Sequence, residues 1–395
     1  MTNAAEVLWR TIFWVSLGAT AYTYFLYPVL LEAAAGWVQA RRARRPTGAP
    51  PWSEADLPAV TMVISAYNER AVLPDKIANC RALDYPAGKL TFLIGSDGST
   101  DGTAQWLAGM GDERFRTVHR PVRRGKAAML NRLMKQVRSE IVVFSDANTV
   151  YAPEAVRQLV RRFADRRVGA AIGKLNLTAP AGDAQVCRPE GLYWRYENRL
   201  KKLESVLGAV PTINGAIFAF RRELYAPAPR QAVTEDQVLG MKIMARGFRC
   251  VFAEDAEAQE SVSTWRGELQ RRVRISAGNF QSLFLAPGVL HPRCGWTWFA
   301  FVSHKLLRWL APFFLAGMLT ANLFLAGELF YGGTLLVQGL FYGLGLLGVV
   351  LSKASGAAKL LAAPRYFLTM NVAILVGLVR FLTGRQRVTW VRVPR

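Results

Sequence analysis

With 395 residues and a hydrophobic share of 51%, the chain holds more apolar side chains than one soluble core needs, and they gather at its two ends. The net charge of +22 suits a polyanionic partner, but no nucleic-acid-binding motif is present and many arginines flank apolar segments. This pattern favours a cytoplasmic membrane face over nucleic acid. The cysteines are far apart and form no CxxC pair, which excludes a zinc ribbon and a disulfide framework.

An uncharged stretch near the N-terminus, Thr11–Leu31, is long enough to cross a bilayer as a helix. It lacks a small-residue cleavage pattern, so we expect a retained anchor rather than a signal peptide. Four arginines follow it within residues 41–45, whereas only Arg10 precedes it. The positive-inside rule therefore places the N-terminus outside and the chain from residue 41 onward in the cytoplasm. The prolines between residues 46 and 58 indicate a linker.

From residue 59 to about residue 260, short apolar runs alternate with helical stretches. Three of the runs are predicted to be strands: Ala59–Ser65, Leu90–Gly95 and Ile141–Ser145. A more polar segment, Phe115–His119, is predicted to be a further strand. Strands separated by helices at this spacing are typical of a mostly parallel sheet that is covered by helices on both faces.

Polar residues follow these predicted strands. Glu69, Asp97 and Asp146 come just after three of them, and Lys126 begins a helix directly after Gly125. Each feature alone is most simply a turn, a helix N-cap or a solvated basic loop. Together they favour a pocket for a nucleotide diphosphate, because ligands of open α/β sheets bind beyond the carboxyl ends of the strands. Within the motif Asp146-Ala-Asn148, carboxylate and amide oxygens are suitable ligands for a hard divalent cation.

Four segments together resemble the successive motifs of family 2 glycosyltransferases, which have a GT-A fold and include cellulose, chitin, hyaluronan and poly-N-acetylglucosamine synthases. These segments are Val63–Glu69, Gly95–Gly102, Gly125–Asn131 and Ser145–Asn148. The resemblance implies that Tyr67, Glu69 and Asp97 hold the nucleobase and ribose, and that Lys126 positions the nucleotide. It also implies that Asp146 and Asn148 bind the metal. Asn148 departs from the family pattern, which usually has a second Asp there, and an amide brings no charge to offset the cation.

The second half of the family pattern covers the acceptor side. Ile213–Phe220 is predicted to be a strand and resembles the segment that floors the acceptor site, with Gly215 in it. In Thr234-Glu235-Asp236, the resemblance makes Asp236 the general base and its two neighbours acceptor-binding residues. An N-cap with acidic first-turn residues is the alternative interpretation.

A further family motif, rich in Gln and Arg and ending in Arg-Trp, corresponds to Arg271-Arg272-Val273-Arg274-Ile275. The resemblance implies that Arg274 approaches the pyrophosphate and that Arg271 and Arg272 serve the acceptor. Ile275 replaces the Trp, whose flat face would meet an acceptor sugar in polymerising members. The alternative for this run is a cationic amphipathic helix lying on the bilayer, as is also expected for residues 192–207.

Three apolar stretches follow, at about Trp309–Leu329, Tyr331–Leu351 and Leu360–Leu382. If all three crossed the membrane, the Arg-rich tail would end outside, against the positive-inside rule. The third stretch is also short between Arg365 and Arg380, so we expect it to be interfacial or re-entrant. The tail segment Thr389–Arg392 resembles, weakly, a cytosolic Trp-containing motif of hyaluronan-synthase-like enzymes.

The sequence therefore predicts an α/β GT-A domain, a Rossmann-like mixed sheet of the nucleotide-diphospho-sugar transferases, flanked by transmembrane and interfacial helices. The predicted divisions are a transmembrane anchor (1–40), a basic, proline-rich linker (41–58), the cytosolic GT-A domain (59–265), an Arg-rich acceptor or interfacial segment (266–304), membrane helices (305–383) and a basic tail (384–395).

The resemblance implies an inverting, multi-pass glycosyltransferase of the bacterial inner membrane with a cytosolic catalytic domain. It would use a UDP-sugar and Mg²⁺ or Mn²⁺ to make a β-linked exopolysaccharide or cell-envelope glycan, with or without secretion partners. One alternative, favoured by Ile275, is transfer of a single sugar to a polyprenyl-linked acceptor. A second is an inactive membrane scaffold, which the coexistence of Asp97, Lys126, Asp146 and Asp236 argues against.

Overall fold

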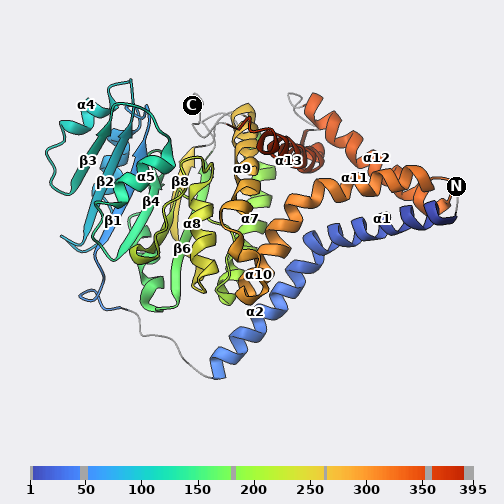
Figure 1. Ribbon diagram of the computed structural model, residues 1–395, viewed down its shortest axis with the longest axis horizontal. Coiled ribbons are helices and arrows are strands. Elements are labelled where there is room, and N and C mark those ends of the chain that lie inside the picture. The colour runs from blue at the N-terminus through green and yellow to red at the C-terminus, as the bar shows by residue number, and fades with distance from the viewer. Residues whose placement is uncertain (1–2, 45–51, 179–183, 262–264, 352–357, 387–395) are drawn as a thin grey trace.

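The computed structural model describes residues 3–44, 52–178, 184–261, 265–351 and 358–386. A sheet covered by helices forms one end of the molecule, and long helices extend away from it to the other end, where the N-terminus lies (Figure 1). The predicted tail motif at residues 389–392 lies outside the described residues.

One sheet contains eight strands in the order β3-β2-β1-β4-β7-β6-β8-β5. The strands are β1 Val60–Ala66, β2 Leu90–Asp97, β3 Phe115–Arg120, β4 Ile141–Asp146, β5 Val150–Tyr151, β6 Val168–Thr178, β7 Phe218–Arg221 and β8 Arg249–Ser261. The first four strands in this order run parallel, and β7 is antiparallel to both β4 and β6. The sheet is therefore mixed. Its first half, which consists of the four strands that the sequence predicted, is entirely parallel, and β6 and β8 in the second half also pair in parallel.

Helices cover both faces of the sheet because each strand alternates its buried side chains between them. Met62 and Ile64 of β1 pack on one face, and Val63 between them packs on the other. The first face is covered by α3 Leu73–Arg81, α4 Thr103–Ala108 and α6 Ala155–Arg161. The second face is covered by α5 Lys126–Met134 and α8 Glu235–Ala245. This double coverage explains why β1, β2 and β4 are nearly continuous apolar runs, whereas β3, at the edge of the sheet, is more polar.

The predicted strand Ile213–Phe220 is wrong in its first half, because β7 contains only Phe218–Arg221. The Asn214 side chain accepts a hydrogen bond from the backbone N–H of Ala216 at 3.1 Å. Such a local side-chain bond forms a turn and competes with strand pairing. Residues 213–217 are therefore an irregular segment at the floor of the site rather than part of the ladder.

The N-terminal helix is continuous from residue 3 to residue 44, as α1 Asn3–Ala21, a π-helical segment Tyr22–Leu26 and α2 Tyr27–Arg44. It extends into the predicted linker, so residues 41–44 are helical, as an Ala- and Arg-rich sequence favours. Three helices of the described chain are long and apolar enough to cross a membrane, namely Trp296–Leu325, Leu329–Val350 and Leu361–Leu382, and the N-terminal helix is not one of them. The anchor role of residues 1–40 stays a prediction.

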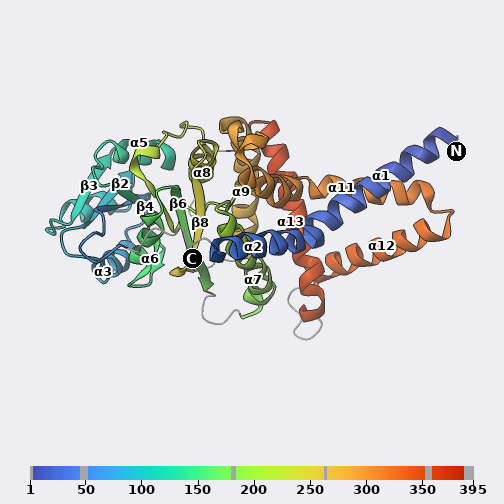
Figure 2. The same ribbon diagram turned by 90° about the horizontal axis from the view of Figure 1, so that it is seen from below.

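The N-terminal helix packs along α11 Leu307–Leu325 and meets the start of α12 Leu329–Val350 (Figures 1 and 2). Trp9 stacks on Phe324 with ring centroids 4.3 Å apart, and Arg10 pairs with Glu328 at 2.9 Å. Many apolar side chains of these helices face outward, and Leu329 is 94% exposed. Unpartnered apolar surface of this extent is what a lipid environment would cover.

The last helix, α13 Ala358–Leu382, has a different direction from these three. It is seen nearly end-on in Figure 1 and lengthwise in Figure 2, so it crosses the direction of α1 and α11. It packs between α12 and α9 Trp265–Leu285, and Gly345 and Gly348 of α12 lie directly against its backbone. If α1 and α11 lie along the membrane normal, α13 lies near the membrane plane, as expected for an interfacial segment.

The helix predicted at residues 192–207 is the second half of α7 Ala184–Leu207, which packs along α2. Its Glu204 accepts a hydrogen bond from the Tyr27 hydroxyl of α2 at 2.8 Å and contacts Nδ1 of His304 at 2.6 Å. His304 is fully buried in a second π-helical segment, Phe301–Leu306, which joins α10 Trp296–Ala300 to α11. This buried polar network ties the sheet domain to the helical region.

Candidate active site

One cavity of about 2930 Å³ begins at the carboxyl ends of β1, β2 and β4 and continues between α9 and the helices α11, α12 and α13. Every residue that the sequence predicted for the site lines it. They are Tyr67, Glu69, Asp97, Lys126, Asp146, Asn148, Gly215, Thr234, Glu235, Asp236, Arg271, Arg272 and Arg274. The fold therefore brings the predicted residues to one place, while their individual roles stay proposals.

The loops after β1 and β2 form one wall of the cavity. Asp97 accepts hydrogen bonds from the backbone N–H groups of Arg124 at 3.0 Å and Gly125 at 2.6 Å. Gly98 has φ +67°, and a Cβ there would meet the backbone nitrogen of Arg123 at 2.4 Å, so only glycine allows this approach. The Arg123 guanidinium lies 3.5 Å from the ring centroid of Tyr67. The predicted basic turn is therefore folded against Tyr67 and Asp97, although the Arg124 side chain is exposed.

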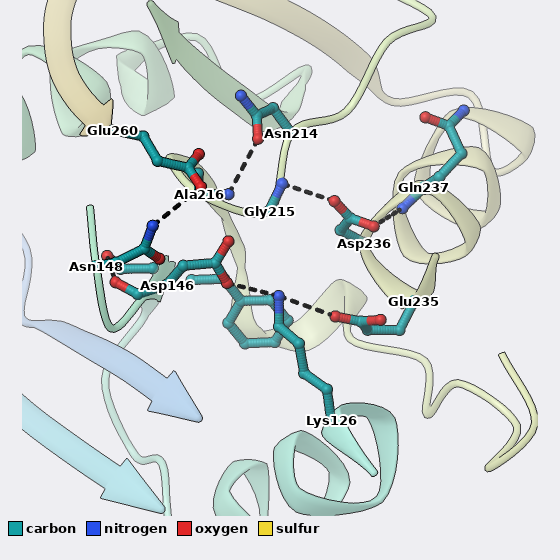
Figure 3. Close-up of polar contacts among 12 residues, drawn as sticks. Lys126, Asp146, Asn148, Asn214, Gly215, Ala216, Glu235, Asp236, Gln237 and Glu260 are labelled. Atoms are coloured by element: carbon teal, nitrogen blue, oxygen red, sulfur yellow. Dashed lines mark hydrogen bonds and ion pairs between the residues drawn. The ribbon is translucent and has the colours of Figure 1, made fainter. Parts of the chain in front are cut away.

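Lys126 connects the two halves of the site (Figure 3). Its ammonium group donates to Asp146 Oδ1 at 2.7 Å and pairs with Glu235 Oε1 at 3.2 Å. Burial opposes ionisation of Asp146, but the Lys126 charge, with the more distant Arg271 and Arg274, outweighs burial and holds the pKa of Asp146 below its usual value. At Glu235 the net shift is in the opposite direction. Burial and the neighbouring negative charge of Asp236 both raise the pKa of Glu235, and together they outweigh the lowering effect of Lys126.

The loop that follows β4 is held from the opposite side by Lys76, a residue that sequence reasoning missed. Lys76 is buried, and its ammonium group donates to Ser145 Oγ at 2.8 Å and to the Thr149 carbonyl at 2.5 Å. Burial lowers the pKa of Lys76 to about 8. A lysine in the apolar pattern of an amphipathic helix gave no sequence signal, because its partners come from a distant strand.

The Asn148 amide donates to Glu260 Oε1 at 3.0 Å (Figure 3). Glu260, at the end of β8, is a second residue that the sequence analysis missed. The only signal was a polar Gln259-Glu260-Ser261 at the end of a strand. Within the described residues, no three His, Cys, Asp or Glu side chains cluster as a metal site. Asp146, Asn148 and Glu260 nevertheless provide hard oxygen ligands of the kind that Mg²⁺ and Mn²⁺ take.

Asp236 lies at the start of α8 and is fixed by two backbone N–H groups. Its Oδ2 atom accepts from Gly215 at 2.6 Å, and its Oδ1 atom accepts from Gln237 at 2.9 Å. The Thr234 side chain makes no capping hydrogen bond to α8 and packs against Gly278 of α9 instead. The start of α8 therefore lacks the side-chain hydrogen bond that a Thr N-cap would make.

The contact between Gly215 and Asp236 gives a first prediction. A Cβ at residue 215 would lie 2.8 Å from Asp236 Oδ2, so Gly215→Ala must displace the carboxylate. We expect transfer to fall on the order of 10- to 100-fold, since misplacing a reacting group by about 1 Å costs this much. The measurement is the sugar-transfer rate. Gly111→Ala, where a Cβ meets no atom within 4 Å, is the control, and equal rates for both variants would contradict the prediction.

The arginines of α9 face the cavity. Arg272 pairs with Glu268 at 2.6 Å, and Arg271 lies 3.6 Å from the same carboxylate. Arg274 donates to the Val233 carbonyl at 3.3 Å, next to the start of α8. The cationic face of this helix is thus turned toward the site, which goes against the alternative of a helix whose charges lie on a bilayer. Ile275 also lines the cavity.

A sequence model described as glycosyltransferase-like family 2 matches residues 58–278, which is more than half of the chain. The chain belongs to this glycosyltransferase family. It is 28% identical over 259 residues to an N-acetylglucosaminyltransferase of Mesorhizobium japonicum, covering 61% of this chain and 60% of that protein. It is 28% identical over 237 residues to a poly-β-1,6-N-acetyl-D-glucosamine synthase of Staphylococcus aureus, covering 58% and 56%. The chain thus matches less than two thirds of the length of these relatives.

A solved mannosyltransferase of Pyrobaculum calidifontis, in complex with GDP-Man and Mn²⁺, has a similar structure. The TM-score is 0.66, with 24% identity over 96% of this chain and 99% of that one. At this identity the likeness concerns the fold, and it confirms the predicted GT-A architecture of the family 2 glycosyltransferase.

Proposed function

We propose that this family 2 glycosyltransferase transfers a sugar from a UDP-sugar with inversion, making a β-linked exopolysaccharide or cell-envelope glycan at the bacterial inner membrane. The observation that carries the proposal is the shared cavity. Lys126, Asp146 and Asp236 all line it, and it opens between the membrane-candidate helices, which supports a donor side at Lys126 and Asp146. A donor from the cytosol and an acceptor at the membrane would therefore meet beside Asp236.

In this mechanism Asp236 is the general base. Its carboxylate takes the proton of the acceptor hydroxyl while that oxygen forms a bond to the anomeric carbon of the donor. The bond from this carbon to the nucleotide diphosphate breaks on the opposite side, and the leaving group carries the electron pair away. Gly215 and Gln237 keep the carboxylate oriented. Lys126 and Arg274 would stabilise the charge that develops on the leaving diphosphate.

A divalent cation fits the same edge of the site. Asp146 has one oxygen bound by Lys126, and Asn148 and Glu260 add two further oxygen donors beside it. When bound, Mg²⁺ or Mn²⁺ would neutralise charge on the departing diphosphate. The Mn²⁺ in the similar mannosyltransferase supports this part of the proposal.

The runner-up is the addition of one sugar to a lipid-linked acceptor. Two observations favour it. The first is Ile275 in place of an aromatic residue. The second is a group of cations on the membrane side of the cavity, where Lys305 lies 3.6 Å from Glu197 and Arg308 forms an ion pair with the same carboxylate. Cations at this depth suit the phosphate of a polyprenyl acceptor. The names of the relatives, an N-acetylglucosaminyltransferase and a poly-N-acetylglucosamine synthase, favour a glycan product.

The experiment that tests both is incubation of membranes holding the enzyme with a panel of radiolabelled UDP-sugars, with GDP-mannose for comparison, followed by sizing of the product. We expect a polymer from one UDP-sugar, and complete loss of incorporation after EDTA treatment. A lipid carrying one sugar would overturn the polymer proposal in favour of the runner-up. Incorporation from GDP-mannose alone would overturn the UDP-sugar assignment, and full activity in EDTA would overturn the metal site.

We also propose a multi-pass arrangement with the catalytic domain in the cytosol. The arginines in the last turn of α2 and the basic residues near the end of α13 then lie on the same side, because α13 need not cross the bilayer. The orientation of α13 across α1 and α11 supports this arrangement.

A further inference from the structure

The end of β8 lies against the loop that carries Asp146 and Asn148. The short strand β5 begins just after this loop and pairs antiparallel with β8, with Val150 opposite Gln259. This register puts Glu260 across from Thr149, one position from Asn148. Figure 3 shows the Glu260 carboxylate turned toward the side chains of Asn148 and Asp146.

The two carboxylate oxygens of Glu260 have different surroundings. Oε1 accepts from the Asn148 amide at 3.0 Å, whereas Oε2 is buried and has no hydrogen-bond partner in the described chain. The closest ion-pair partner of Oε2, the Arg271 Nη2 atom, is 3.7 Å away, beyond hydrogen-bond distance. The side chain is only 13% exposed. A buried carboxylate oxygen without a donor is costly unless a cation completes its environment.

We propose that Glu260 is the third protein ligand of the divalent cation held by Asp146 and Asn148. It supplies the negative charge that Asn148 does not. The inference rests on the proposed function only in its need for a divalent cation. With Glu260 the set has two carboxylates and one amide, which gives the same formal charge as a pair of aspartates in the loop itself. The hydrogen bond to Oε1 fixes the amide of Asn148, so its oxygen and Oε2 both remain for the metal.

An ion pair with Arg271 does not account for Glu260 by itself. Arg271 has a second carboxylate partner, Glu268, at 3.6 Å, and the Glu268 side chain is 2% exposed. The arginine would therefore keep a buried counter-charge without Glu260. Asn148, in contrast, has Glu260 as its only side-chain hydrogen-bond partner among the described residues.

The test measures Mn²⁺ binding to the purified full-length protein in detergent by electron paramagnetic resonance, with and without UDP. We expect Glu260→Gln to weaken Mn²⁺ binding by about tenfold or more, because the charge of a site sets its affinity. Adding Asn148→Asp to that variant should restore binding, since the carboxylate is moved to the other side of the same site. Glu257→Gln, a neighbour on β8 that pairs with Lys174 at 2.9 Å, is the matched control and should bind as the wild type does.

Each outcome separates the inference from the proposed function. Unchanged Mn²⁺ binding in Glu260→Gln, with binding in the wild type, overturns the role of Glu260 and leaves the glycosyltransferase proposal intact. Equal losses in Glu260→Gln and Glu268→Gln would show that both act through Arg271, which also overturns the ligand role. Failure of Asn148→Asp to restore binding, in a variant that still binds UDP, overturns the charge argument. No Mn²⁺ binding by the wild type, even with UDP, overturns the inference together with the metal part of the proposed function.

Discussion

Asp236→Asn should abolish sugar transfer while leaving UDP binding nearly unchanged. The substitution keeps the size of the side chain but removes the carboxylate that would accept the acceptor proton. Since a positioned general base contributes about 10²- to 10⁴-fold, we expect a loss of turnover in this range. Both oxygens of Asp236 accept hydrogen bonds from backbone N–H groups. In the variant, the side-chain NH₂ group would therefore face one of these N–H donors and lose that hydrogen bond. Turnover with saturating donor and UDP affinity by calorimetry are the two measurements.

The control for this substitution is Asp255→Asn. Asp255 is an exposed carboxylate that pairs with Arg162 on the sheet domain and does not line the cavity. It should keep wild-type turnover. If Asp236→Asn also keeps wild-type turnover and loses only thermal stability, Asp236 merely anchors the start of α8 to Gly215, and the base must be sought elsewhere in the cavity.

The parallel half of the sheet and its helices could be predicted from sequence because local patterns determine them. Strands β1, β2 and β4 are apolar runs bounded by polar turns, and each polar end falls at the same sheet edge once the strands are parallel. The resemblance then named Asp236, Lys126 and the arginines of α9 in advance. Their meeting in one cavity followed from the family pattern rather than from any local signal.

The remainder depended on contacts between distant parts of the chain. Glu260 reaches the site only because β5 and β8 pair in one particular register. Lys76 occurs in an ordinary helical pattern, and its burial under the loop after β4 depends on Ser145 and Thr149. The strand predicted over Ile213–Phe220 is wrong in its first half because the Asn214 side chain forms a turn, which outweighs the favourable apolar pattern.

Lys126→Met should reduce transfer by at least about 100-fold, because charge stabilisation of this kind is usually worth 10²- to 10³-fold. Donor binding should weaken with it, since Lys126 is the ammonium group that joins Asp146 to Glu235. Without it, two neighbouring carboxylates keep their burial but lose their counter-charge. Asp146 is 34% exposed to the cavity, so we expect a stability loss of about 1–3 kcal/mol, below that of a fully buried broken pair.

The pH dependence of stability distinguishes the loss of the Lys126 charge from a simple packing defect, because only the loss of charge should make the stability difference change with pH. In the wild type the pKa of Asp146 lies below its unfolded value, so its stabilising contribution is present above that unfolded value and is lost as pH falls through the folded pKa. In Lys126→Met, burial would dominate and raise this pKa, so protonation would relieve the folded state. Acidification from about pH 7 to 5 should therefore raise the stability of the variant relative to the wild type.

The measurement is thermal unfolding of wild type and variant across this pH range, with Lys135→Met as the control. Lys135 is exposed at the opposite end of α5, so its loss should change neither transfer nor the pH trend. A constant stability difference between Lys126→Met and wild type from pH 7 to 5 would mean that the lysine fills space without neutralising Asp146. Lys126 would then have no electrostatic part in holding the donor edge, and the charge that balances the leaving diphosphate would have to come from Arg274 and the cation.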